Sequence, residues 1–142
     1  MRAVVTRVKS ASVTRTGSGQ TLGAIGKGFL VLLGVHTDDT AAQADKIADR
    51  ICGLRVFDDE AGKMNIRPAD AGAELLIVSQ FTLWADCRSR RPGFTAAARP
   101  ETAIPLYERV IEACRAQGFR VETGEFGSSG RICRSPLSTT GR

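Results

Sequence analysis

The sequence contains a single histidine, His36, among its 142 residues, and aromatic residues make up only 6% of it. Hydrolases of the Ser-His-Asp and Cys-His types need a histidine as general base, so such an enzyme would have to use His36. That residue follows the apolar run FLVLLGV, which is typical of a buried strand. We therefore expect a structural role for His36 at the end of a strand, with catalysis as the alternative.

Metal-binding patterns are also lacking. The four cysteines, Cys52, Cys87, Cys114 and Cys133, lie far apart and form no CxxC pair. Their spacing argues against a zinc ribbon or a thioredoxin-like redox site, and no cluster of His, Cys, Asp or Glu has the spacing of metal ligands. The sequence therefore predicts no metal site. A hydrolase with Cys87 as nucleophile is an alternative, although no histidine lies near this cysteine in the sequence.

Long apolar runs are absent as well. No segment has the length or hydrophobicity of a signal peptide or a membrane span, so we expect a cytoplasmic protein that does not contact a membrane. The length and a hydrophobic content of 42% fit a single domain. The net charge is +5, and residues 127–142 carry three arginines and no acid. The rest of the chain is thus mildly basic, which permits contact with a nucleic acid without requiring it.

The pattern of strands and helices is clear. Apolar and β-branched residues in short runs predict strands, and apolar residues at helical spacing predict helices. The predicted strands are 2–14 (with a bend near Ser10), 29–35, 73–80 and 119–123, and the predicted helices are 40–54 and 101–117. The stretch 58–72 is rich in Asp, Gly and Pro and predicts a loop. The fold class is therefore α+β, a single domain with a mostly antiparallel sheet and helices packed on it.

Polar residues follow the second of the strongly apolar strands. Ser79, Gln80 and Thr82 come directly after AELLIV. Polar groups at the end of a buried strand either complete a turn or point into a binding site. From the residues alone, both interpretations stay open.

A basic run comes next in the sequence. Arg88, Arg90 and Arg91 lie a few residues after Thr82. A solvated loop explains them, and so does a phosphate-binding segment beside a site, because the guanidinium group suits phosphate geometrically.

Several stretches resemble the D-aminoacyl-tRNA deacylase family. They are MRAVVTRVKSASVT, IGKGFLVLLGV, KMNI, ELLIVSQFTLWADCR, RRPGFT, PLYERV and VETGEFG, in the family's order and at its spacing over residues 1–127. The resemblance implies hydrolysis of the ester bond that joins a D-amino acid, or glycine on a non-cognate tRNA, to the terminal adenosine of tRNA. It also implies a cytoplasmic homodimer whose partner is the acceptor end of aminoacyl-tRNA, with no metal and no organic cofactor.

The resemblance also implies which residues form the site. Ser79, Gln80, Phe81 and Thr82 would be its catalytic segment, and Phe126 would be a wall of its pocket. Ester hydrolysis needs stabilisation of a developing oxyanion, which the backbone N–H groups near Phe81 and Thr82 could supply. The attacking group would be either the Thr82 hydroxyl or a water assisted by the ribose 2′-hydroxyl of the tRNA. The implied role of Arg88, Arg90 and Arg91 is to hold the tRNA acceptor end.

The sequence departs from the family in residues 128–142. Family members continue with a segment like DMQVSLVNDGP, whose Gly-Pro reaches the partner subunit's pocket and discriminates between D- and L-amino acids. This chain has no Gly-Pro after residue 127, because Pro136 follows a serine. One choice of codons for residues 131–142, regrouped from the third base of the first codon, encodes DMQVSLVNDGP. We therefore interpret the tail as an off-frame translation, which sequencing of the source DNA would test.

Two expectations follow from this departure. With Pro136 and only two large aliphatic residues in 127–142, the segment from about 128 onward is expected to be irregular and to leave a sheet edge uncovered. The alternative function is then a catalytically impaired dimeric or tRNA-binding remnant of the family.

Overall fold

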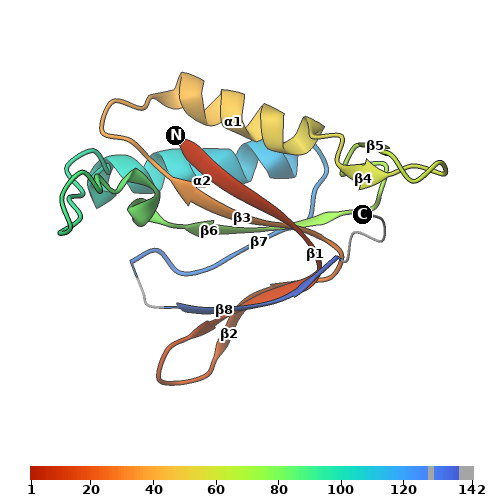
Figure 1. Cartoon of the computed structure of the whole chain (residues 1–142), viewed down its shortest axis with the longest axis horizontal. Helices are drawn as coiled ribbons and strands as arrows, with labels where there is room; N and C mark the ends of the chain where they lie inside the picture. Colours follow the sequence, from red (N-terminus) through yellow and green to blue (C-terminus); the bar gives the residue numbers. More distant parts are fainter. Residues whose placement is uncertain (128–129, 138–142) are drawn as a thin grey trace.

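The computed structural model describes residues 1–127 and 130–137, which form a curved sheet with two helices on one face (Figure 1). The main sheet has the strand order β2-β1-β3-β6-β7, with β8 also paired to β1. Pairs that involve β1 are antiparallel, whereas β3–β6 and β6–β7 are parallel. In chain order the elements are β1 (Arg2–Arg15), β2 (Thr21–Ile25), β3 (Gly28–Gly34), α1 (Ala41–Gly53), β4 (Phe57–Asp58), β5 (Met64–Ile66), β6 (Glu74–Ser79), the 3-10 helix η1 (Phe81–Trp84), α2 (Pro100–Ala116), β7 (Val121–Thr123) and β8 (Gly130–Pro136).

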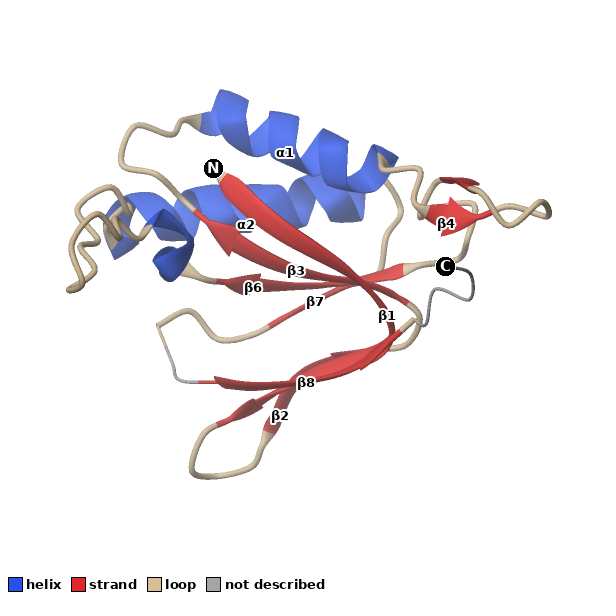
Figure 2. Cartoon of the chain, viewed as in Figure 1, coloured by secondary structure: helices blue, strands red, loops and turns tan. Residues whose placement is uncertain are grey.

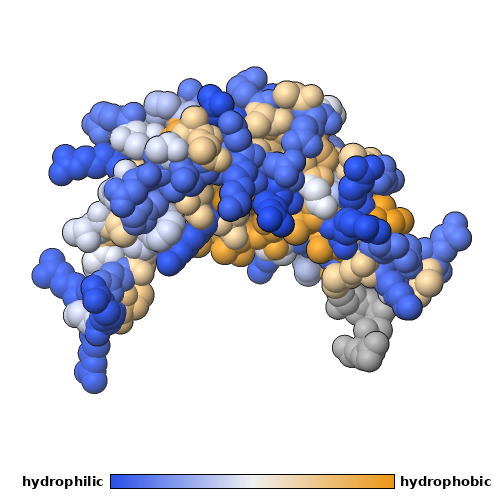
Figure 3. Space-filling model, turned by 90° about the horizontal axis from the view of Figure 1, so that it is seen from above, coloured by the Kyte–Doolittle hydropathy of each residue, from blue (hydrophilic) through white to orange (hydrophobic). Residues whose placement is uncertain are grey.

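Helices α1 and α2 lie side by side on one face of the sheet (Figure 2). Their buried residues recur at helical spacing, such as Ala44, Ala48 and Ile51 on α1, so each helix presents one apolar stripe to the sheet. Both predicted helices are confirmed to within one residue at each end. The outer surface on the helix side is largely hydrophilic, with hydrophobic residues gathered at one rim (Figure 3). In the described ranges, no helix is long and apolar enough to cross a membrane.

Strand β1 belongs to two layers of the sheet. Residues 2–8 pair with β3, and residues 11–14 run between β2 and β8 below the main sheet (Figure 1). The predicted bend is confirmed, and the pairing with β8 shifts register between Val8 and Ser10. A second, smaller core fills the space between the layers and contains Val8, Ala11, Val13, Ile25, Leu30 and Leu76.

The prediction of an irregular tail is wrong for residues 130–136. They form β8, which pairs with β1 from Val8 to Arg15. Few apolar side chains are needed, because backbone hydrogen bonds of the β1 edge hold the strand and Ile132 alone packs against the second core. Pro136 stands at the last position of the strand, where a missing donor is tolerated. Residues 128–129 and 138–142 lie outside the described residues.

Two other features were not predicted. The stretch 58–72 contains the short strand β5, which pairs with β4, and the two parallel pairs, β3–β6 and β6–β7, leave no distinct periodicity in the sequence. Parallel central strands are apolar on both faces, as β3 and β6 are here, so the sequence shows buried strands without showing their direction.

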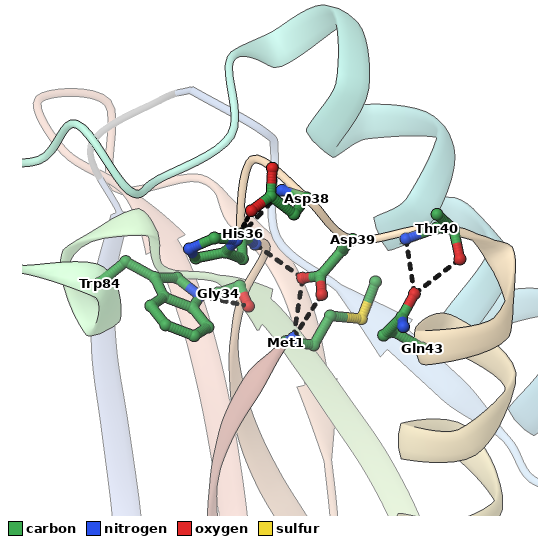
Figure 4. A network of polar contacts seen from close by, with 8 residues as sticks. All are labelled: Met1, Gly34, His36, Asp38, Asp39, Thr40, Gln43 and Trp84. Atoms are coloured by element: carbon green, nitrogen blue, oxygen red, sulfur yellow. Dashed lines mark hydrogen bonds and ion pairs between the residues drawn. The ribbon is translucent and has the colours of Figure 1, made fainter.

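A buried ion pair fixes the connection between β3 and α1 (Figure 4). The Met1 ammonium lies 2.7 Å from the Asp39 carboxylate, with side-chain exposures of 2% and 8%. Asp39 also accepts a hydrogen bond from the His36 backbone N–H at 2.7 Å, and the Gln43 side chain accepts one from the Thr40 N–H at the start of α1.

Removing this carboxylate should destabilise the protein strongly. Asp39→Ala leaves the Met1 ammonium buried without its partner, so we expect the free energy of unfolding to fall by about 3–5 kcal/mol in urea titrations. Asp38→Ala is the matched control, since the Asp38 side chain is 91% exposed and its loss should have little effect. Equal stability of the two variants would contradict a structural role for the ion pair.

Candidate active site

A cavity of about 390 Å³ lies where β6 and β7 end. Three residues of the predicted catalytic segment, Ser79, Gln80 and Phe81, line it together with Phe126, which comes from a segment more than 40 positions away in the chain. Its other lining residues are Val13, Leu22, Val78, Gly124, Glu125, Gly127, Gly130 and Ile132. An apolar floor with a few polar groups at one wall is typical of a small-molecule site.

The polar wall is formed by the end of β6 and the start of η1. Ser79 pairs with Leu33 of β3, and the Gln80 N–H donates to the Leu33 carbonyl at 2.8 Å. The chain then turns into η1. The N–H groups of Phe81 and Thr82 donate to no group in the described part of the chain, as is usual in the first turn of a helix. They are therefore available to a ligand's oxygen.

Thr82 lies outside the lining of the cavity. Its side chain is exposed, and its hydroxyl accepts a hydrogen bond from the Gln80 side-chain amide at 2.5 Å. The structure thus brings Ser79, Gln80, Phe81 and Phe126 together around one cavity. Thr82 lies beside Gln80, outside the cavity lining.

Helix η1 is held against β3 from its other side. The Trp84 indole N–H donates to the Gly34 carbonyl at 3.1 Å. The Arg2 guanidinium lies 3.9 Å above the Trp84 ring and donates to the Leu83 carbonyl. The His36 ring contacts Trp84 edge-on at 4.5 Å between centroids and accepts the Asp38 N–H at 3.0 Å. These contacts support the structural role expected for His36.

The opposite wall is the segment after β7. Beyond Thr123 the chain leaves β6 and passes through residues 124–127, where Gly127 has a φ of +77°, a conformation that favours glycine. Glu125 is bound by Arg15 of β1 at 2.8 Å, which ties this wall to the lower layer. Phe126 is half-buried and lies between the cavity and the hollow beside α2.

The floor of the cavity was missed by the sequence analysis. Val13, Leu22 and Ile132 come from β1, β2 and β8, the strands of the lower layer. Only the bend of β1 brings them beneath β6. Of these segments only β1 was predicted as a strand, and none of the three contains a signal that it faces a site.

The basic loop is anchored at the mouth of the cavity. A bridge between Asp86 and Gly93 closes the loop, and the next residue, Phe94, contacts the Phe81 ring edge-on at 5.2 Å. Arg88 binds Asp86, and this guanidinium lowers the pKa of the Asp86 carboxyl. Arg90 and Arg91 are exposed, and neither side chain forms an ion pair with another residue of the described ranges. Both therefore have free guanidinium groups for an external anion.

The alternative catalytic residues Cys87 and His36 lie away from the cavity. Cys87 is exposed in the basic loop, and neither it nor His36 lines the cavity, so the arrangement does not favour a cysteine hydrolase.

Within residues 1–127 and 130–137, no three His, Cys, Asp or Glu side chains are grouped as they would be around a metal ion. The cavity itself offers backbone N–H donors, an amide and a hydroxyl, which can orient and polarise a carbonyl.

Comparison with known proteins identifies the family. The family model described as D-Tyr-tRNA(Tyr) deacylase matches residues 4–133. The chain belongs to this deacylase family. The match covers the whole cavity-forming part of the chain and ends within β8, a few residues beyond position 128, from which the sequence was interpreted as departing from the family.

Relatives agree with this assignment, and solved structures share the fold. The chain is 52% identical to the D-aminoacyl-tRNA deacylase of Geobacillus sp. and 53% identical to that of Thermus aquaticus, in each case over 90% of this chain and 84% of the relative. A structure titled c-Myc DNA Unwinding Element Binding Protein superposes with a TM-score of 0.87 at 37% identity, over 95% of this chain and 91% of that one. A probable eukaryotic D-amino acid tRNA deacylase shares the fold, with a TM-score of 0.81 at 15% identity over 94% and 92% of the two chains.

Proposed function

We propose that the protein hydrolyses the ester bond of D-aminoacyl-tRNA and of mischarged glycyl-tRNA, releasing the amino acid and free tRNA. The observation that carries the proposal is the cavity in which Ser79, Gln80 and Phe81 face Phe126, in a chain of the deacylase family. Such a reaction proofreads the chirality of the aminoacyl group. We expect the activity to be cytoplasmic, because its substrate would be aminoacyl-tRNA.

The free N–H groups at the start of η1 suit the reaction. Attack on the ester carbonyl creates an oxyanion, and removing one oxyanion donor typically costs a factor of about 10²–10³ in rate. In this proposal, the Phe81 and Thr82 N–H groups bind the oxyanion, and Phe126 bounds the aminoacyl pocket. The Thr82 hydroxyl is engaged with Gln80 and lies outside the cavity lining. The geometry therefore favours assistance by the ribose 2′-hydroxyl over attack by Thr82.

The direct test is to incubate the protein with D-Tyr-tRNA and with L-Tyr-tRNA and to follow loss of the ester. Cleavage of the D-form alone is the expected result. Binding of tRNA with cleavage of neither form would support the alternative, an impaired remnant of the family.

The polar wall can be tested by substitution. Gln80→Ala should weaken deacylation, because the Gln80 side chain lines the cavity just after β6. The fold should stay intact, because this side chain is not part of the core. Thr82→Ala should also lower the rate, by a smaller factor, since its backbone N–H survives the change. Single-turnover rates and melting temperatures would be measured together. Variants that lose thermal stability and keep full activity would refute the assignment.

The basic loop, with Arg88, Arg90 and Arg91, should contribute to tRNA binding. Replacing Arg88, Arg90 and Arg91 with Ala should weaken tRNA binding for all tRNA sequences and flatten its salt dependence, because each phosphate contact contributes about 0.7–0.9 to the slope of log K against log salt. We expect Arg90 and Arg91 to dominate, since Arg88 is already paired with Asp86. An unchanged slope would show that the loop is only solvated.

The tail bears on both the dimer and the chirality filter. We propose that the protein works as a homodimer, as the family resemblance implies, and that residues from about 128 onward are off-frame. A chain restored to DMQVSLVNDGP and the strand that follows it should then be more selective against L-aminoacyl-tRNA than the present one. Sedimentation tests the homodimer and side-by-side assays of the two chains test the selectivity, and equal discrimination between D- and L-Tyr-tRNA would contradict the role of the tail.

A further inference from the structure

Tyr107 of α2 contacts β6 just before the residues that form the polar wall of the cavity. Its hydroxyl donates a hydrogen bond of 2.7 Å to the carbonyl of Ile77, and its side chain is buried, with 5% exposed. Ile77 is the last residue of β6 that pairs with β7, two positions before Ser79. The hydroxyl thus holds β6 at the point where its neighbouring strand ends and the cavity begins.

The ring of the same residue contacts the opposite wall. The Tyr107 and Phe126 rings lie 6.0 Å apart between centroids, at an angle of 56°. Phe126 packs against the edge of the main core and also borders two open spaces, the cavity and a second hollow of about 390 Å³ along α2. Tyr107 is therefore a main support for the position of the Phe126 ring.

We propose that Tyr107 is a positioning residue that sets the distance between the two walls of the cavity, the Ser79–Phe81 segment and Phe126. It does not line the cavity itself, so it acts through Ile77 and Phe126 and not on the substrate. The inference rests on the proposed deacylase function. Burial raises the pKa of the Tyr107 phenol well above its usual range, so the hydroxyl stays a neutral donor throughout the working pH of the enzyme.

The first test separates positioning from stability. Tyr107→Phe keeps the ring and removes only the hydroxyl, which leaves the Ile77 carbonyl without its partner. We expect kcat for D-Tyr-tRNA to fall about tenfold, because small displacements of catalytic groups lower rates strongly. KM should be unchanged, because the tRNA-binding loop is untouched.

Val110→Ala is the matched control. Val110 is fully buried on the same helix and does not line the cavity, so its truncation should lower the melting temperature at least as much and leave kcat unaltered at temperatures where the protein is folded. Full kcat in Tyr107→Phe, or an equal loss of kcat in both variants, would overturn the proposal.

The second test uses the fact that Tyr107 is the only tyrosine of the chain. A ¹³C label on the tyrosine ring gives one NMR signal, which should shift when a non-hydrolysable D-alanyl amide of 3′-amino-3′-deoxyadenosine binds, and the shift should be lost in Phe126→Ala. If the wild-type protein cleaves D-Tyr-tRNA but the signal does not shift at a saturating concentration of this probe, the proposal is overturned. Absence of that cleavage would instead refute the proposed function, and the positioning role with it.

Discussion

Gly34→Ala should lower the rate of D-aminoacyl-tRNA hydrolysis by about tenfold to a hundredfold while the protein stays folded. A Cβ atom at Gly34 would lie 2.9 Å from the Gln80 carbonyl oxygen, 3.0 Å from Leu83 Cβ and 3.2 Å from Trp84. These atoms belong to η1 and its first flanking residue, so the 3-10 helix has to move away from β3. That movement displaces the Phe81 N–H group at the cavity wall and the Thr82 N–H group next to it.

The effect on stability should be much smaller, because η1 contains no buried residue. Gly53→Ala is the matched control: a Cβ there meets no atom within 4 Å, and alanine is the better helix former. Single-turnover rates and thermal melting of both variants provide the measurement. Wild-type activity in Gly34→Ala would show that the position of η1 does not control the reaction.

Gly28→Ala should prevent the protein from folding stably. A Cβ at this position would lie 1.8 Å from the Glu74 carbonyl oxygen and 2.6 Å from the Glu74 N. Both are backbone atoms of β6, so the clash is relieved only if β3 and β6 separate at the start of their pairing. We expect a loss of more than about 4 kcal/mol in the free energy of unfolding, the range of the most damaging single substitutions.

Gly26→Ala tests whether this effect is specific. Its Cβ would meet only the Glu74 carboxylate oxygen, at 3.2 Å, at the end of a flexible side chain. This variant should unfold in urea close to the wild type, whereas Gly28→Ala should show little native circular dichroism. A folded Gly28→Ala protein of normal stability would contradict the tight β3–β6 approach.

The sequence predicted those parts of the fold that local patterning determines. Both helices have a buried stripe at helical spacing, and β3 and β6 are uninterrupted apolar runs, so each was visible within a short window. The short β4–β5 pair was missed, because two- and three-residue strands in a polar stretch depend on tertiary contacts. β8 was missed for a related reason, since its stability comes from the open edge of β1 and not from its own side chains.

The site was predictable only in part. Ser79, Gln80, Phe81 and Phe126 were named from the resemblance, and the fold brings them to one cavity. The free N–H groups of η1 belong to the backbone and have no residue-type signature. Tyr107 lies in an ordinary amphipathic helix, where an aromatic residue is expected in the core, and only its contacts to Ile77 and Phe126 distinguish it.

The pairing of β1 with β8 has a consequence for synthesis of the protein. β8 supplies Gly130 and Ile132 to the cavity, yet it pairs with residues at the beginning of the chain. A ribosome releases those early residues long before residues 130–136 leave its exit tunnel. The nascent chain therefore exposes one edge of β1 and an open cavity until residues 130–136 have left the tunnel, so the candidate site forms later than the β1–β3 pairing.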